Sequence, residues 1–370
     1  MSQPQLKDGI NTKSIALIAT AINNVDADFP AKTFKRLASK NLNTLELKDR
    51  VYHIIGALHQ TLPADFKKSA KILMAVKKSW DISNKLDRYG FAAWAITDYV
   101  GVHGLEHPQQ SLKLLQHLTS LFSAEFAIRP FIHQHPQAAW ICLHRWVEHK
   151  DESVRRLASE GCRPRLPWGT QLQELIDFPM PIIALLSKLK DDKSDYVRRS
   201  VANNLNDISK DHPELVIKVC KQWSKSASKE CQWIIRHATR SLVKKGHPEV
   251  FALLGYTAKP KVSFSPLSLS SKTIKLGETL EFSTQLDSQL KADQNLVVDY
   301  AIHYVKANGT SSAKVYKLKN ITLKANDSLP IKKRQAFKPI STRKFYPGEH
   351  HLEILLNGTA VAKKSFRLIV

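Results

Sequence analysis

The first part of the chain, residues 1–256, has the apolar spacing of amphipathic helices. Apolar positions recur every three or four residues in stretches of roughly 10 to 18 residues, separated by short breaks rich in Pro, Gly, Asn and Asp. The whole chain contains only 13 glycines, which favours helix over sheet. The pattern predicts an all-α region whose clearest helices are 46–62, 65–80, 109–122, 136–150 and 212–226.

Three of the helical stretches share a short motif. In each, an apolar residue is followed by Arg-Arg or Arg-His and then by small residues, and the motif returns after about 40 residues. Such an interval, built from helix pairs, is typical of a HEAT-like or armadillo-like solenoid, in which the second helix of each pair lines a concave surface. We therefore predict a superhelical stack of HEAT-like repeats that includes DESVRRLASEGC (151–162), SDYVRRSVANNL (194–205) and QWIIRHATRSLV (232–243).

From residue 259 onward the pattern changes to alternating apolar and polar positions, with many β-branched and aromatic residues. Turn signals such as Asn308-Gly309, Pro347-Gly348 and Asn357-Gly358 separate the segments. Roughly seven strands in about 110 residues are typical of an immunoglobulin-like β-sandwich, here without the cysteine pair of antibody domains. We predict a helical domain over 1–256 and an immunoglobulin-like sandwich over 257–370.

The chain is strongly basic, with 56 Lys and Arg against 33 Asp and Glu and a formal net charge of +23. This excess is larger than solubility requires and predicts a polyanionic partner, nucleic acid first and an anionic membrane second. About half of it lies in the shorter β region. There the run Lys332, Lys333 and Arg334 is a candidate DNA contact, although lysines on edge strands also protect sheets from aggregation.

Simple absences exclude or disfavour several functional classes. No apolar run approaches the roughly 18 residues of a membrane span, and MSQPQLKDGINTKS has no signal-peptide pattern, so we expect a cytosolic protein. The histidines lack metal-ligand spacing and there is no Gly-rich phosphate loop, so we expect no metal and no cofactor. The four cysteines are too far apart for CxxC sites and are expected to be reduced: Cys142, Cys162, Cys220 and Cys231.

Two neighbouring segments combine charged and aromatic side chains. In the predicted helix 151–161, the apolar stripe leaves Arg156 and Glu160 one turn apart on another face, where they could simply form a surface pair. The loop that follows, GCRPRLPWG (161–169), is expected to expose its two arginines and to present Trp168 between Pro and Gly. An indole held this way suits stacking on a base or a cation. The alternative is that Trp168 fills a gap between two repeats.

Over essentially its whole length the chain resembles the AlkC branch of the AlkC/AlkD alkylpurine DNA glycosylases, with motifs in the helical part and mainly the architecture in the β part. That branch includes members with an immunoglobulin-like C-terminal domain. The resemblance implies a HEAT-like solenoid that wraps duplex DNA and removes cationic alkylated bases, chiefly 3-methyladenine and 3-methylcytosine. The segments that carry it are ELKDRVYHIIGALHQTLP (46–63), AEFAIRPFI (124–132), SVRRLASEGCRPRLPWG (153–169) and DYVRRSVANNLNDISKDHPE (195–214).

The resemblance implies that Glu125, Glu160 and Trp168 line the active site, with Asp207 at a matching acidic position. Carboxylates suit this reaction because a base methylated at N3 departs as a neutral molecule, while the sugar develops oxocarbenium character. The indole of Trp168 can stabilise the cationic nucleotide through its π face. Without the resemblance, Glu125 has an ordinary alternative, since it lies near a predicted helix start and could pair with Arg129.

Carboxylates that face DNA are repelled by its phosphates. The neighbouring arginines are therefore expected to hold the phosphate backbone in place despite this repulsion. The prediction is a monofunctional, cofactor-free glycosylase, acting as a monomer on double-stranded DNA with alkylated bases in the bacterial cytosol or nucleoid. The alternative is a non-enzymatic HEAT-repeat scaffold that binds nucleic acid or an acidic protein. The arginines expected to contact DNA are Arg156, Arg163, Arg165, Arg199, Arg236 and Arg240.

Overall fold

The computed structural model describes residues 5–80, 90–340 and 343–370. The chain divides into two compact units. One contains the residues up to Asp211 together with Ala227–Ala238, and the other contains His212–Ser226 and Thr239–Val370. Among the helices of these described ranges, none has both the length and the apolar content that crossing a membrane requires.

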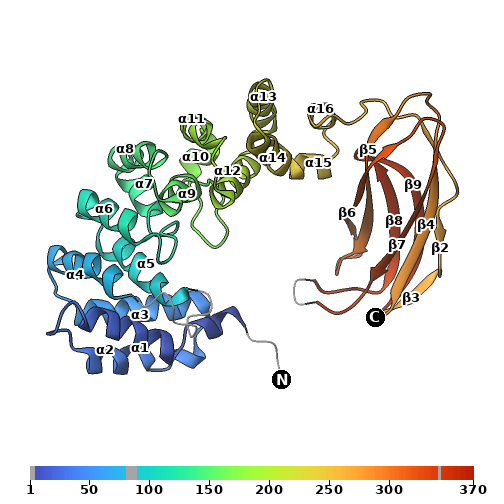
Figure 1. Cartoon of the computed structure of the whole chain (residues 1–370). Helices are drawn as coiled ribbons and strands as arrows, with labels where there is room; N and C mark the ends of the chain where they lie inside the picture. The colour runs from blue at the N-terminus through green and yellow to red at the C-terminus, as the bar shows by residue number, and fades with distance from the viewer. Residues whose placement is uncertain (1–4, 81–89, 341–342) are drawn as a thin grey trace. The chain divides into compact units, whose positions relative to one another are not determined.

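The first unit consists of helices that follow one another in chain order (Figure 1). Many begin with a residue that suits a helix N-terminus. The Asn11 and Asp151 side chains accept hydrogen bonds from backbone N–H groups of the first turn, and prolines occupy early positions where no N–H is needed. The helices are η1 (Leu6–Gly9), α1 (Thr12–Asn23), α2 (Ala31–Ser39), η2 (Leu42–Thr44), α3 (Leu47–Thr61), α4 (Phe66–Ser79), η3 (Phe91–Ala93), α5 (Trp94–His103), α6 (Pro108–Leu118), α7 (Arg129–Gln134), α8 (Pro136–Trp146), α9 (Glu152–Gly161), α10 (Gln173–Asp177), α11 (Met180–Leu189), α12 (Asp195–Ile208) and α14 (Lys229–Ala238).

The helices that carry the repeated motif pack against one another. Helix α12 contacts both α9 and α14, and α11 contacts α9 and α12. Within α9 the buried stripe contains Val154, Leu157, Ala158 and Gly161, which is the spacing expected from the sequence. The predicted helical stack, with a β domain after it, is confirmed.

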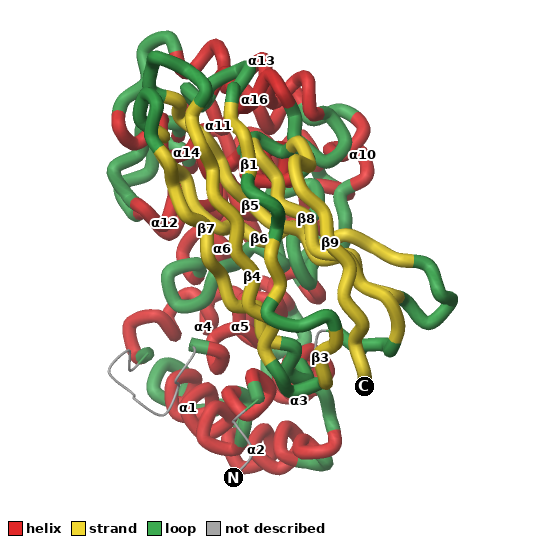
Figure 2. Tube along the Cα trace, turned by 90° about the vertical axis from the view of Figure 1, so that its right-hand side faces the viewer, coloured by secondary structure: helices red, strands yellow, loops and turns green. Residues whose placement is uncertain are grey.

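The second unit contains a β-sandwich and three helices, α13 (Pro213–Ser224), α15 (Arg240–Lys244) and α16 (Pro248–Leu253). In one sheet β4 pairs with β1, β2 and β7, and the other has the order β3-β9-β8-β5-β6. Figure 2 draws the strands in yellow. All of these pairings are antiparallel except that of β3 with β9. The strands are β1 (Val262–Phe264), β2 (Ser268–Leu269), β3 (Thr273–Lys275), β4 (Thr279–Ser288), β5 (Gln294–Val305), β6 (Ser311–Leu323), β7 (Ser328–Ala336), β8 (Gly348–Leu356) and β9 (Thr359–Ile369).

The segment that follows α15 contacts the sandwich through its backbone. After α15, Gly246 lies directly against Gly358, the turn residue between β8 and β9. Next to this contact the Asn357 side chain donates a hydrogen bond to the carbonyl of Thr257, at 2.9 Å. The change from helices to strands near residue 257 is therefore not the place where the chain divides into compact units.

Replacing Gly358 with Ala should destabilise the second unit more than replacing Gly255 with Ala. Both glycines have a positive φ, +78° and +77°, so both variants pay the backbone cost of an L-residue there. A Cβ at 358 would also lie 2.2 Å from the Gly246 Cα, whereas a Cβ at 255 meets no atom of the described residues within 4 Å. We expect G358A to lose about 3 kcal/mol and G255A about 1 kcal/mol in urea unfolding. Equal losses would contradict the Gly246–Gly358 contact.

Candidate active site

A cavity of about 260 Å³ opens in the first unit, between the η3–α5 segment, residues 121–128, α9 and the loop that follows α9. Its walls combine aromatic rings with two carboxylates. This composition is unusual because carboxylates in an apolar wall are costly unless they are paired. The lining residues are Phe91, Trp94, Phe122, Glu125, Phe126, Glu160, Arg163, Leu166, Pro167 and Trp168.

The aromatic side of the cavity, which we call the aromatic floor, consists of Trp94, Phe122 and Phe126. The Trp94 ring stacks on both phenylalanines, with centroid distances of 5.1 Å to Phe122 and 5.3 Å to Phe126. Phe91 meets Trp94 edge-on. Aromatic faces present partial negative charge and so attract cations.

The two carboxylates of the cavity are held by one guanidinium. Arg156 Nη1 donates to Glu125 Oε2 at 2.6 Å, and Arg156 Nη2 lies 3.5 Å from Glu160 Oε1. The guanidinium lies over the Tyr196 ring, 4.4 Å from its centroid. Burial opposes the charge of Arg156, but Glu125 and Glu160 together raise its pKa above the ordinary value.

The Arg156–Glu160 pair that the helical spacing predicts is thus present. The pairing of Glu125 with Arg129, the ordinary alternative for that residue, is not what the structure shows. Glu125 instead contacts Arg156 and accepts a hydrogen bond from the Ser123 hydroxyl, at 2.7 Å. Helix α7 begins at Arg129 rather than near Ser123, so Glu125 lies in the turn before it.

Arg163 lies between two carboxylates instead of in solvent. Its Nη1 donates to Glu160 Oε1 at 2.7 Å and its Nε donates to Asp207 Oδ2 at 2.8 Å. Asp207 is also bonded by Lys210 Nζ, at 2.8 Å, and is not among the residues that line the cavity. The expectation of an exposed Arg163 is wrong, because Glu160 and Asp207 neutralise the guanidinium and allow its burial. Arg163 is 7% exposed, and its guanidinium is engaged by the two carboxylates.

Arg129 organises the loop that presents Trp168. Its buried guanidinium donates to the carbonyls of Gly161 at 3.0 Å, of Arg163 at 2.8 Å, and of Thr170 through two nitrogens, one at 2.7 Å. Burial lowers the pKa of Arg129 to about 10. The sequence offered one signal for this role, an arginine inside the apolar run AEFAIRPFI.

Trp168 stands at the rim of the cavity with 55% of its surface exposed. Its backbone has a φ of +66°, a conformation that bulky L-residues rarely adopt, and Lys48 Nζ donates to its carbonyl at 2.9 Å. Strain of this kind persists where surrounding contacts enforce it, and it often marks a functional site. The alternative of a Trp filling a gap between repeats does not fit this exposure.

The remaining predicted DNA contacts are on the surface, in both units. Arg165 pairs with Asp211, at 2.8 Å, and Arg199 pairs with Asp195, at 2.6 Å. Arg236 is exposed and Arg240 is half-buried. Lys332, Lys333 and Arg334 are exposed on β7, where Lys332 lies 2.9 Å from Glu281. Within the ranges described, no three His, Cys, Asp or Glu side chains gather as metal ligands do.

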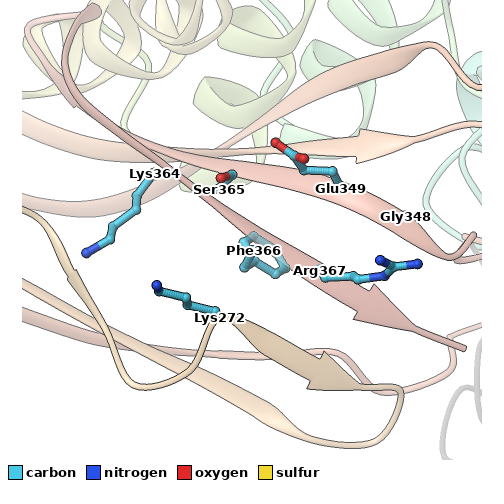
Figure 3. A pocket seen from close by; sticks show the side chains of 7 residues that line it. All are labelled: Lys272, Gly348, Glu349, Lys364, Ser365, Phe366 and Arg367. Carbon is cyan, nitrogen blue, oxygen red and sulfur yellow. The ribbon is translucent and has the colours of Figure 1, made fainter.

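A larger hollow of about 550 Å³ lies on the sandwich, beside β8 and β9. Figure 3 shows the cationic side chains Lys272, Lys364 and Arg367 around it, with Glu349 as its one carboxylate. Lys364 is already bonded, since its Nζ donates to the Leu267 carbonyl at 2.9 Å. This hollow has no pair of carboxylates and no aromatic floor, so it does not offer the chemistry of the cavity in the first unit.

Comparisons with known proteins agree with a helical region followed by an immunoglobulin-like β domain. Residues 263–370 match the family described as "Uncharacterised protein YhaZ, C-terminal Ig-like domain". The chain is 38% identical to the uncharacterised protein YhaZ of Bacillus subtilis (strain 168) over 356 residues, 95% of this chain and 97% of YhaZ. It is also similar to the solved structure of Pseudomonas fluorescens alkylpurine DNA glycosylase AlkC bound to DNA containing an abasic site analog, with 38% identity, a TM-score of 0.93, and coverage of 99% of this chain and 100% of AlkC.

Proposed function

The chain belongs to the family that contains AlkC of Pseudomonas fluorescens and YhaZ of Bacillus subtilis, and we propose that it is an alkylpurine DNA glycosylase. It hydrolyses the N-glycosidic bond between an alkylated base and deoxyribose in double-stranded DNA. The observation that carries this proposal is the cavity in which Glu125, Glu160 and the exposed Trp168 meet over an aromatic floor. A non-enzymatic scaffold would have no use for paired carboxylates in such a cavity.

The substrates of this proposal are cationic bases such as 3-methyladenine and 3-methylcytosine. A base that carries a positive charge before the reaction leaves as a neutral molecule, so it needs little help from a general acid. The sugar becomes positively charged instead, and preplaced carboxylates stabilise that charge and orient the attacking water. Trp168 and the half-buried rings of Phe122 and Phe126 attract the cationic base through their π faces.

The arginines of the site hold these carboxylates in place. Arg156 fixes the separation of Glu125 and Glu160, and Arg163 ties Glu160 to Asp207. Both arginines therefore act through the carboxylates rather than through DNA phosphate. Asp207 acts through Arg163, so we assign it to positioning, whereas Glu125, Glu160 and Trp168 face the substrate.

The direct test is base release from a duplex that carries one defined 3-methyl lesion. We expect the purified protein to form an abasic site at that position, with the same yield in the presence of a metal chelator. An undamaged duplex of the same sequence is the control. A protein that binds both duplexes and forms no abasic site would be the non-enzymatic scaffold.

Replacing Trp168 with Ala should slow base release by about tenfold, because a desolvated cation–π contact contributes about 1 to 2 kcal/mol. The free energy of unfolding should change little, since the side chain is more than half exposed. The matched control is Phe178→Ala, which removes another exposed aromatic side chain that does not line the cavity. Equal activity of W168A and wild type would remove Trp168 from the site.

We also propose that Lys332, Lys333 and Arg334 contact the DNA backbone. Replacing all three with Ala should weaken DNA binding and reduce the steepness of its salt dependence, by about one unit of slope for each phosphate that these side chains neutralise. Removing Lys272, Lys364 and Arg367 takes away the same charge from the hollow in Figure 3. If the slope of the salt dependence falls equally in the two triple variants, the change comes from the lost net charge. It would then not show that the β7 side chains contact DNA.

A further inference from the structure

Asp98 is a buried carboxyl group that the proposed mechanism does not yet use. It lies on α5, a helix whose residues from Trp94 to Gly101 are all buried. Its Oδ2 accepts a hydrogen bond from Trp94 Nε1 at 2.8 Å, and its Oδ1 has no hydrogen-bond partner among the described residues. An unsatisfied buried carboxylate oxygen costs free energy, so its presence calls for an explanation.

The hydrogen bond from Trp94 connects Asp98 to the cavity. Trp94 lines the cavity and stacks on Phe122 and Phe126, which lie on either side of Glu125 in sequence. Because the indole N–H lies in the ring plane, a bond from it to a fixed acceptor sets the orientation of that plane. The orientation of the aromatic floor therefore depends on a carboxyl group one helical turn along α5.

The charged groups around Asp98 come from two other segments. From α3, Lys48 and Tyr52 face it, and from residues 121–128, Glu125 faces it. Burial raises the pKa of Asp98 to about 7, opposed by the Trp94 hydrogen bond and the Lys48 charge and assisted by Glu125. Burial and the charge of Asp98 also raise the pKa of Tyr52.

We propose that Asp98 is a positioning residue that fixes the indole plane of Trp94 and, when ionised, strengthens the attraction of the aromatic floor for a cationic base. This inference rests on the proposed glycosylase function and adds a source of regulation by pH. A carboxylate that accepts the indole N–H bond pushes electron density toward the ring. Trp94 is only 1% exposed, so this negative charge acts on a bound cation across the stacked rings of Phe122 and Phe126 and not by direct contact. Protonation of Asp98 removes that effect while the ring stays in place.

The test is the pH dependence of single-turnover base release, measured for wild type, Asp98→Asn and Lys48→Gln. We expect the wild-type rate to rise between about pH 6 and pH 8, because Asp98 ionises in that range. D98N keeps an acceptor for Trp94 but has no charge, so its rate should be about threefold lower at pH 8 and should lack this rise. K48Q should move the midpoint to higher pH, because the Lys48 charge lowers the Asp98 pKa.

Urea unfolding supplies a readout that does not require activity. Because the pKa of Asp98 is raised in the folded state, wild type loses stability as the pH rises from about 4 to about 7. D98N does not have this loss, so its urea midpoint should exceed that of wild type at pH 8 and match it near pH 4. An aspartate with a merely structural role would give the opposite result, a less stable D98N at pH 8.

The outcomes separate the two proposals. A wild-type protein that releases no methylated base at any pH refutes the glycosylase function. An active wild type whose pH profile is unchanged in D98N refutes the role of Asp98, and so does a D98N variant that is less stable than wild type at pH 8. A flattened profile together with a raised urea midpoint supports it.

Discussion

Replacing Glu160 with Gln should slow base release by about a hundredfold, with nearly unchanged binding to the same DNA. Glu160 lines the cavity. Its Oε1 lies 2.7 Å from Arg163 Nη1 and 3.5 Å from Arg156 Nη2. Its other oxygen, Oε2, makes no hydrogen bond within the described residues. A carboxylate held in this way is oriented before substrate binds, so the stabilisation of a positive sugar needs no reorganisation.

Glu125→Gln should slow base release by at least about tenfold, but by less than Glu160→Gln does. Glu125 shares the Arg156 guanidinium with Glu160, and it lies in a turn and not on a helix. The matched control is Glu152→Gln. Glu152 lies on α9 as Glu160 does, but it is exposed at the first turn of the helix and bonds only to Ser194 among the contacts described. Single-turnover release and a binding titration on lesion-containing duplex measure the two properties separately. Wild-type rates in both E160Q and E125Q would show that neither carboxylate is catalytic.

The second large effect is expected on stability, from replacing Arg163 with Met. Methionine fits the volume of the side chain but leaves the buried Glu160 and Asp207 without the cation that lies between them. Breaking a buried pair by removing one partner costs about 3 to 5 kcal/mol, because an uncompensated charge remains inside the protein. Arg156 and Lys210 still approach these two carboxylates, so we expect the lower part of that range.

This prediction has a defined pH dependence. In wild type burial opposes the charge of Arg163, but Glu160 and Asp207 together raise its pKa above the ordinary value, so the guanidinium stays charged. In R163M the isolated carboxylates are easier to bury when protonated, so the stability difference from wild type should shrink as the pH falls. Adding Glu160→Gln and Asp207→Asn to R163M should recover most of the loss at neutral pH. No recovery would show that the loss comes from packing rather than from charge.

Arg165→Met is the control for R163M. Arg165 lies two residues along the same loop and also pairs with an aspartate, Asp211, but at the surface. Exposed pairs contribute little to stability, so the urea midpoint of R165M should stay close to that of wild type. A loss in R165M equal to that in R163M would mean that the loop itself, and not the buried charge, determines the effect.

The helical repeats and the β-sandwich were both predictable from the sequence, because their signals are local. The spacing of Val154, Leu157 and Gly161 within a single helix reports its buried face without any knowledge of its neighbours. The same holds for the alternation along β4 and for the Asn357-Gly358 turn, whose residues both have a positive φ. The Arg156–Glu160 pair also depends only on positions one turn apart.

Other properties of the site depend on residues far apart in the chain. The pairing of Glu125 with Arg156 joins positions separated by 31 residues, and the bond from Arg163 to Asp207 spans 44. From the sequence alone, an arginine in a loop is expected to be exposed. Only the fold shows that two carboxylates, Glu160 and Asp207, lie beside Arg163. The aromatic floor and Asp98 were missed for the same reason, although the one charged residue in the apolar stretch AAWAITDYVGV was a usable signal.

The sequence by itself determined the two kinds of fold, the strongly positive charge and, through its resemblance to a known family, the acids and the tryptophan on which the proposed chemistry rests. Only the tertiary structure decided which charges neutralise one another, which arginines are buried, and what supports the cavity from behind. The physical reason is that secondary structure follows from periodicity along the chain, whereas burial and ion pairing follow from distances between segments that periodicity does not encode.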